Sequence, residues 1–137
     1  MQQHENIIVF NCVGNYFPIM EKRKELKKSK LYSSSQSSPL KYNDGKERTY
    51  SHRYPKSIKT YSNASQSNKK HPTQKPVELL EYLIKTYTNE GEVVLDSTMG
   101  SGSTCVAAKN TNRKYIGIEL DKDYFEIAKE RVNGGLF

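Results

Sequence analysis

The spacing of apolar residues in the second half of the chain predicts its secondary structure. Between residues 77 and 87, apolar side chains recur at i, i+3 and i+4, which places them on one face of an amphipathic helix. These positions are Leu79, Leu80, Leu83, Ile84 and Tyr87. Pro76 suits the first turn of this helix, and the Asn-Glu-Gly sequence at 89–91 ends it.

Four further elements follow this helix in alternation. A β-branched run predicts a strand over 93–96, and a segment rich in small residues predicts a short helix over 104–111. A second strand is predicted over 114–118, and a last helix over 124–132 begins from Asp121 or Asp123 as its cap. Because strands that alternate with helices form parallel sheets, we expect an α/β fold.

The first half of the chain has a different pattern. Ile7, Ile8, Val9 and Phe10 form an apolar run that predicts a buried strand, so we assign residues 1–13 to the sheet of the core. Such a strand needs sheet neighbours and covering helices. Residues 14–70 are dominated by Ser, Asn, Gln, Lys and Tyr without a period of 2 or 3.6, and we expect long loops with at most short helices or strands.

Positive charge is concentrated in this polar region. From Glu21 to Lys75 there are 15 Lys or Arg against 4 Asp or Glu, although the whole chain has a net charge of +7. Tyrosines are interleaved with the basic residues, which favours a nucleic-acid surface; the alternative is a solvated, partly disordered insertion. The candidate DNA-binding residues are Lys22, Arg23, Lys24, Lys41, Arg48, Arg53, Lys56 and Lys59.

Length and composition limit the class of protein to which this chain can belong. The length of 137 residues fits one domain, while the mean hydropathy of −0.84 indicates that part of the chain is poorly packed. The sequence has no apolar run that could span a bilayer and no signal-peptide pattern, so we expect a soluble, cytoplasmic protein without a membrane partner. Cys12 and Cys105 lack metal-ligand spacing, and we interpret them as reduced core or loop residues and expect no metal site.

The candidate chemistry lies in the turn that follows the first predicted strand of the second half. The strand ends on Asp96, the chain passes through Gly100 and Gly102, and Ser103 or Thr104 can cap the next helix. Glycines allow a sharp turn and a close approach to a ligand, and a helix N-terminus offers free N–H groups. This pattern predicts a nucleotide-binding turn; the alternative is an ordinary βαβ unit with a capped helix.

Neighbouring residues limit the kind of nucleotide that this turn could bind. A phosphate-binding P-loop is excluded because Ser103, and not Lys, follows the last glycine, and a dinucleotide fingerprint is weakened by Cys105 at its third glycine. Glu119 ends the second strand about 20 positions after the turn, where a carboxylate can receive ribose hydroxyls. Asp96 would repel a pyrophosphate but suits an ammonium group. S-adenosylmethionine carries both a ribose and an ammonium, so we expect it as the cofactor.

Three motifs together resemble one enzyme family. They are His-Pro-Thr-Gln-Lys-Pro at 71–76, Asp-x-x-Met-Gly-Ser-Gly-Ser-Thr at 96–104 and Gly-Ile-Glu-Leu-Asp at 117–121. In this order they resemble the S-adenosylmethionine-binding part of the DNA methyltransferases that modify N6 of adenine or N4 of cytosine, in the group whose catalytic region comes first. The resemblance implies an incomplete Rossmann-like, three-layer α/β core with a loop-rich basic insertion, in which 71–137 is the S-adenosylmethionine-binding βαβ region. It also implies that 14–70 occupies the position of the target-recognition region, with double-stranded DNA as the partner.

The resemblance also implies roles for individual residues. Thr73, Gln74 and Lys75 would lie near the methionine carboxylate, Asp96 would face the amine, and Glu119 would hold the ribose, while 100–104 would form the wall of the methionine pocket. Ser97 and Thr98 stand where the family usually has Pro and Phe, which predicts a poorer apolar contact to the cofactor. The full predicted set is Thr73, Gln74, Lys75, Asp96, Ser97, Met99, Gly100, Ser101, Gly102, Ser103, Thr104, Glu119 and Leu120.

The catalytic motif of that family does not occur in this sequence. The family uses a polar residue followed by Pro-Pro and an aromatic, and the five prolines here, at 18, 39, 55, 72 and 76, are never adjacent. We therefore name no catalytic residue and expect an incomplete core that becomes a methyltransferase with a complementary N-terminal half, or that dimerises to cover its sheet edges. The alternatives are a catalytically inactive DNA-binding or remnant protein and, less favoured, a dinucleotide-binding fragment.

Overall fold

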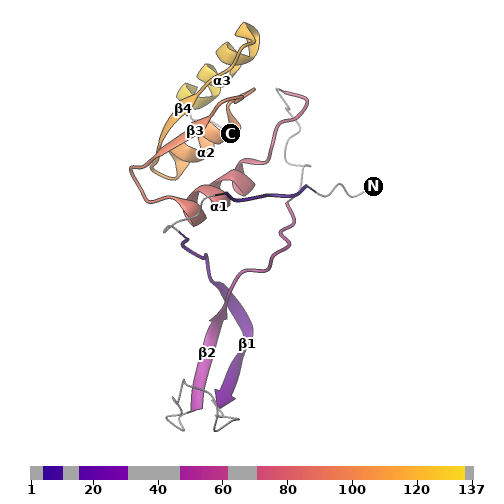
Figure 1. Cartoon of the computed structure of the whole chain (residues 1–137), viewed down its shortest axis with the longest axis vertical. Coiled ribbons are helices and arrows are strands. Elements are labelled where there is room, and N and C mark those ends of the chain that lie inside the picture. Colours follow the sequence, from indigo (N-terminus) through magenta and orange to yellow (C-terminus); the bar gives the residue numbers. More distant parts are fainter. Residues whose placement is uncertain (1–4, 11–15, 31–46, 62–70, 135–137) are drawn as a thin grey trace. The chain divides into compact units, whose positions relative to one another are not determined.

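The computed structural model describes residues 5–10, 16–30, 47–61 and 71–134 (Figure 1). It divides into two compact units. The larger unit comprises Met1–Phe17 and Ile58–Phe137, and the smaller one comprises Pro18–Ser57. The smaller unit is shorter than the predicted segment 14–70, so that Lys59 belongs to the larger unit.

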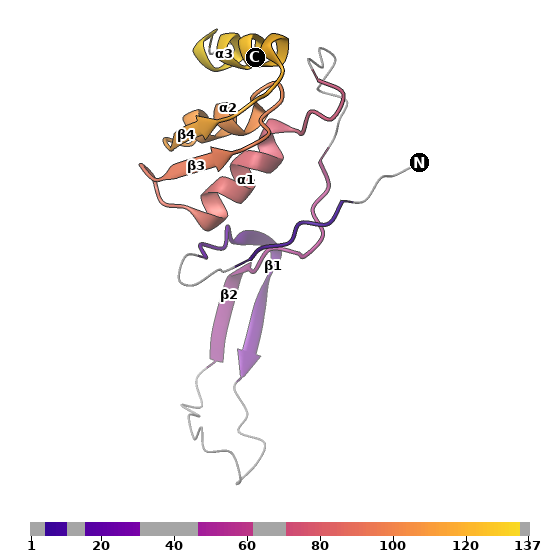
Figure 2. The same ribbon diagram turned by 45° about the horizontal axis from the view of Figure 1, so that its top comes forward.

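The larger unit contains the alternating elements that the sequence predicts. In chain order these are α1 (Val77–Tyr87), β3 (Val93–Asp96), α2 (Ser103–Asn110), β4 (Lys114–Gly117) and α3 (Lys122–Gly134). β3 and β4 pair in parallel, with Val93 opposite Lys114 and Asp96 opposite Gly117. α2 packs against both strands, against α1 and against α3 (Figures 1 and 2). The prediction of an α/β fold is confirmed.

The core of this unit is built on the small side chains of α2. Ala107 and Ala108 are fully buried against Ile84 of α1, and Cys105 and Val106 form a second buried cluster with Val132 of α3. Small side chains allow helices to approach each other and the sheet closely. Burial of each Val or Ile side chain stabilises the fold by roughly 1.5–3 kcal/mol.

The opposite face of the β3–β4 sheet is uncovered in the part of the chain that the structure describes. Val93 and Leu95 of β3, Ile116 of β4 and Ile118 just beyond β4 alternate along the sequence toward this face. Val93, Leu95, Ile116 and Ile118 are 55%, 62%, 53% and 54% exposed, respectively. We call these four residues the open sheet face. Parallel sheets normally have both faces covered by helices. One helical layer on one sheet face therefore corresponds to an incomplete Rossmann-like core.

The predicted strand at Ile7–Phe10 is not formed in this structure. These residues pair with neither described sheet, and the side chain of Phe10 is 82% exposed. The physical reason is that an apolar strand is stable only when it has hydrogen-bonded neighbours and when its faces are covered. The described residues supply neither.

The smaller unit is more regular than the sequence predicts. β1 (Glu21–Lys30) and β2 (Glu47–Arg53) form an antiparallel hairpin where we expected long loops with short pieces of structure. Sequence reasoning missed it because every described residue of β2 is exposed, so no apolar side alternates with a polar side. The register shifts between Lys22 and Lys27, where four residues of β1 stand opposite one residue of β2.

Candidate functional site

Three of the sequence motifs converge beyond the carboxyl ends of β3 and β4. The backbone N–H of Gly100, in the glycine turn, donates to Glu119 Oε2 over 2.8 Å. Ser101 Oγ, in the same turn, donates to Gln74 Oε1 over 3.0 Å, so that the 71–76 loop is joined to the turn. The carboxyl ends of parallel strands are where α/β folds bind their ligands.

The two glycines of the turn have left-handed backbone conformations. Gly100 has φ 52° and Gly102 has φ 78°. A Cβ on Gly102 would lie 2.8 Å from Cβ and 3.1 Å from Cα of Ala128 in α3. Gly102 is therefore required by the packing of α3 as well as by the backbone conformation.

The predicted capping of α2 by a hydroxyl is wrong. Gly102 is the N-cap residue and makes no side-chain cap bond, while Ser103 is already the first residue of the helix. The left-handed conformation of Gly102 starts the helix, and no side chain of the N-cap residue accepts from its first N–H groups. The Oγ of Ser103 instead accepts from Arg131 Nη1 over 3.4 Å. The prediction of Asp121 as the cap of α3 is confirmed, since its Oδ1 accepts from the N–H groups of Asp123 and Tyr124.

Glu119 is held by the backbone around it. Its carboxylate accepts hydrogen bonds from the N–H groups of Asp121, Gly100 and Leu120, and these bonds lower its pKa below the usual range. The side chain is therefore ionised at neutral pH. Each carboxylate oxygen has two acceptor sites, and Oε2 receives only the Gly100 N–H among these three, which leaves it able to accept a hydroxyl.

Asp96 has one oxygen committed to the turn. Its Oδ1 accepts from the N–H of Thr98 over 3.1 Å, and no described residue donates to Oδ2. Ser97 and Thr98 are exposed. An anionic oxygen at this position can bind a cationic group of a ligand, as the sequence predicts for an ammonium.

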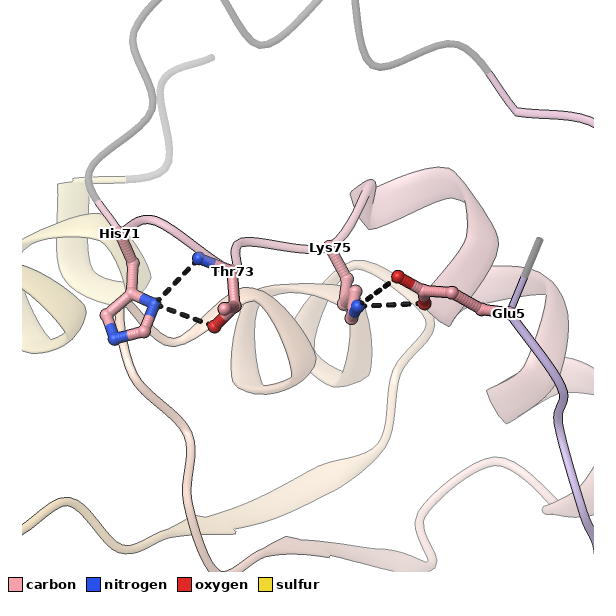
Figure 3. A network of polar contacts seen from close by, with 4 residues as sticks. All are labelled: Glu5, His71, Thr73 and Lys75. Carbon is pink, nitrogen blue, oxygen red and sulfur yellow. Dashed lines mark hydrogen bonds and ion pairs between the residues drawn. The ribbon is translucent and has the colours of Figure 1, made fainter. Parts of the chain in front are cut away.

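Lys75 has a partner that the sequence does not predict. Its Nζ lies 2.7 and 2.8 Å from the two carboxylate oxygens of Glu5, from the segment at the start of the described chain (Figure 3). No sequence signal connects these residues, which are 70 positions apart. Both side chains are largely exposed, and exposed ion pairs of this kind stabilise by about 0–1 kcal/mol. A carboxylate of a ligand can therefore compete for the ammonium.

Arg131 of α3 is a second residue that sequence reasoning missed. Its Nη1 donates to the carbonyl oxygen of Ser101 and, over 2.8 Å, to the Oγ of the same residue. Burial lowers its pKa. Arg131 thereby fixes the glycine turn through the backbone and side chain of Ser101. The only sequence signal is a basic residue in the last turn of a predicted helix, which is common and unspecific.

Met99 and Leu120, two other predicted site residues, have side chains in opposite environments. Met99 points into the interior, with its Sδ 3.9 Å from Sγ of buried Cys105, and lines a small apolar pocket of about 220 Å³. Burial raises the pKa of the Cys105 thiol, which agrees with a reduced core residue. The side chain of Leu120 is 97% exposed beside Glu119. Cys12 lies outside the described residues.

The candidate DNA-binding residues do not form one group. Most of them line a concavity of about 740 Å³ at the irregular part of the hairpin, namely Lys22, Arg23, Lys24, Arg53 and Lys56, together with Lys27. Arg48 lies further along β2, opposite Ser29. Lys59 is in the larger unit, where its Nζ lies 4.8 Å from the ring centroid of Tyr82. Lys41 lies outside the described residues.

The described residues limit two other classes of site. They contain no group of three His, Cys, Asp or Glu side chains that could hold a metal ion. Within the same ranges, no helix is both long enough and apolar enough to cross a membrane.

Known proteins match this chain over most of its length. The N6/N4 family model described as DNA methylase matches residues 1–130. The type II methyltransferase M2.LlaDCHI of Lactococcus lactis subsp. cremoris is 42% identical over 120 residues, which cover 85% of this chain and 42% of that protein. The type II methyltransferase M2.DpnII of Streptococcus pneumoniae is 51% identical over 63 residues, covering 46% of this chain and 24% of that protein.

Among solved structures, the crystal structure of the M1.HpyAVI–SAM complex is 47% identical over 56% of this chain and 36% of that chain, with a TM-score of 0.48. The chain spans less than half the length of these relatives. The three motifs that suggested the resemblance all lie within the residues that the family model matches. The chain therefore belongs to the DNA methylase family.

Proposed function

We propose that this chain is the S-adenosylmethionine-binding part of a DNA methyltransferase that modifies N6 of adenine or N4 of cytosine. The observation that carries the proposal is the convergence of the 71–76 loop, the glycine turn and Glu119. Their hydrogen bonds bring residues from three distant motifs to one edge of a parallel sheet. Family membership and the names of the relatives support the same reaction.

The available groups fit the charges of the cofactor. Asp96 Oδ2 would accept from the ammonium, and ionised Glu119 would accept from a ribose hydroxyl. Lys75 would bind the methionine carboxylate in exchange for Glu5. The exposed side chain of Leu120 would gain apolar cover from the nucleoside. Each of these roles is a proposal for the site described above.

The methyl transfer itself needs a nucleophile outside this site. The exocyclic nitrogen of the base forms a bond to the methyl carbon while the carbon–sulfur bond breaks, its electron pair goes to sulfur, and the nitrogen releases a proton. A base must leave the duplex stack to reach such a site. We propose that a complementary part with the Pro-Pro-aromatic motif accepts the flipped base and covers the open sheet face, whose exposed apolar residues are typical of an interaction surface.

We further propose that the hairpin of the smaller unit contacts the DNA. Its described residues carry nine Lys or Arg and three Glu, and six of the basic side chains surround the concavity at the register shift. Clustered cations bind the phosphate backbone and release its counterions. Because phosphate contacts carry no sequence information, these cations would contribute to affinity for DNA of any sequence.

Calorimetric titration of the purified chain with S-adenosylmethionine tests the cofactor proposal, with NAD as the control ligand. We expect saturable binding of S-adenosylmethionine alone. Asp96→Asn should weaken it by at least about tenfold, since a charge-assisted hydrogen bond contributes about 1.5–3 kcal/mol. Glu90→Gln, an exposed carboxylate outside the site, should leave the affinity unchanged. An unaltered affinity in the Asp96 variant would remove that residue from the site.

A further inference from the structure

His71 joins three segments of the candidate site. Its Nδ1 lies 3.3 Å from the backbone nitrogen and 3.1 Å from the Oγ1 of Thr73, within the 71–76 loop (Figure 3). Its ring meets the ring of Tyr124 in α3 edge-on, with 4.3 Å between centroids. A Cβ on Gly100 would lie 3.3 Å from the same ring, so that the glycine turn passes directly against it.

The contacts at Nδ1 indicate the tautomer of the ring and the direction of the hydrogen bonds. A backbone N–H can only donate, so the Nδ1 that it faces must carry a lone pair, and the ring N–H is on Nε2. Because Nδ1 has no proton, the Thr73 hydroxyl must also donate to it. The hydroxyl oxygen then presents only lone pairs to a ligand.

We propose that His71, whose ring lies against the glycine turn, is a positioning residue that fixes Thr73 within the 71–76 loop and makes its hydroxyl a hydrogen-bond acceptor. An acceptor suits the ammonium of the methionine end, in contrast to the carboxylate that the sequence resemblance assigns to Thr73. At the amino-acid end of the cofactor the ammonium donates hydrogen bonds whereas the carboxylate only accepts them, so the ammonium would be the group that Thr73 Oγ1 binds. The inference rests on the proposed function for the identity of the ligand, but the arrangement of His71 and Thr73 stands on the distances above.

Two substitutions of His71 distinguish the effect of its hydrogen-bond acceptor from the effect of its aromatic ring. His71→Asn keeps an oxygen near the position of Nδ1 but loses the contact to Tyr124. His71→Phe keeps the aromatic contact but replaces the acceptor with a C–H group. We expect the Asn variant to have a lower melting temperature with affinity for S-adenosylmethionine within about twofold of the parent. The Phe variant should keep its melting temperature and bind S-adenosylmethionine about fivefold more weakly, as expected for one hydrogen bond.

A second ligand distinguishes positioning from general damage to the site. 5′-Methylthioadenosine contains the nucleoside but has no amino-acid end, so its affinity should be the same in the parent and in His71→Phe. Equal weakening of both ligands would overturn the proposal, as would equal affinities of the Asn and Phe variants for S-adenosylmethionine.

The amide resonance of Thr73 provides a test that needs no ligand. In nuclear magnetic resonance spectra of the full chain, we expect this resonance to move in His71→Phe and to stay near its parent position in His71→Asn. An unmoved resonance in the Phe variant would contradict the hydrogen bond itself. If the resonance behaves as expected but the parent chain binds no S-adenosylmethionine, the proposed function fails while the arrangement of His71 and Thr73 stands.

Discussion

At the scale of single residues, the candidate site is a set of polar groups whose hydrogen bonds are partly used by the protein. Glu119 organises three backbone N–H groups, and Asp96 organises one. Lys75 is paired with Glu5. These contacts hold the charged groups in place before a ligand arrives, which reduces the ordering needed on binding.

The lowered pKa of Glu119 predicts a dependence of stability on pH. Its backbone hydrogen bonds favour the ionised form in the folded state, so the stabilisation is complete above the unfolded-state pKa of about 4.3. It is lost as the pH falls through the lower folded-state value. The melting temperature of the parent should therefore exceed that of Glu119→Gln at neutral pH, and the difference should shrink in acid. A difference that is constant between about pH 7 and pH 3 would contradict this prediction.

At the scale of elements, the glycine turn and the hairpin are the two features that carry the proposed function. The turn places a strand end, a loop and two helices within contact of one another through Gly102 and its neighbour Ser101. The hairpin brings basic residues from two stretches of sequence around one concavity. In both cases the arrangement depends on the backbone more than on any one side chain.

A pair of glycine substitutions tests the close packing of the turn. Gly102→Ala must adopt a left-handed backbone and also collides with Ala128, whereas Gly91→Ala has a similar φ of 82° but no atom within 4 Å of its Cβ. The left-handed conformation costs about 1–2 kcal/mol in both variants. Overpacking adds about 1–3 kcal/mol for Gly102→Ala alone. Urea unfolding should therefore show a lower free energy of unfolding for Gly102→Ala than for Gly91→Ala. Equal free energies of unfolding in the two variants would exclude the steric contribution.

The role of the hairpin can be tested by the salt dependence of DNA binding. Replacing Lys22, Arg23 and Lys24 together by Gln removes three charges at the concavity. If all three contact phosphates, the slope of log affinity against log salt should fall in magnitude by about 2.7. Fluorescence anisotropy with a labelled duplex measures this slope. The control replaces Lys85, Lys114 and Lys122 by Gln in the larger unit, and an equal change in that variant would mean that only net charge matters.

At the scale of the whole molecule, the open sheet face is the main departure from a self-sufficient domain. Its four apolar residues, three on the adjacent parallel strands and Ile118 just beyond β4, are each more than half exposed. Surfaces of this kind are normally covered by another part of a protein or by a second copy. The relatives, of which this chain spans less than half, are long enough to contain such a cover.

We predict that the isolated chain self-associates through this face. Light scattering should give a mass above 15.7 kDa that rises with concentration. Leu95→Glu combined with Ile116→Glu should shift the chain toward the monomer, provided that circular dichroism shows retained helix content. Leu26→Glu, which changes an exposed apolar residue of the hairpin, serves as the control. A monodisperse and highly stable parent monomer would count against an incomplete core.

The sequence by itself determined the alternating elements and the glycine turn, and it predicted the chemistry of the site. Each of these depends on local signals: helical periodicity in 77–87, β-branched runs at the two strands, and glycines at positions with positive φ. The same signals led to the family, which the match over residues 1–130 confirms. The residue roles and the division into domains stay predictions.

Only the tertiary structure decided which groups support the site. Glu5 and Arg131 contact Lys75 and Ser101 across 70 and 30 positions of the sequence. The ring of His71 lies against Gly100 in the same way, and no spacing in the sequence reveals such contacts. The hairpin was missed because a solvated two-stranded ribbon has no apolar side to impose a period. The strand at Ile7–Phe10 was predicted from apolarity alone, but a strand forms only with neighbours, which belong to the tertiary structure and not to the local sequence.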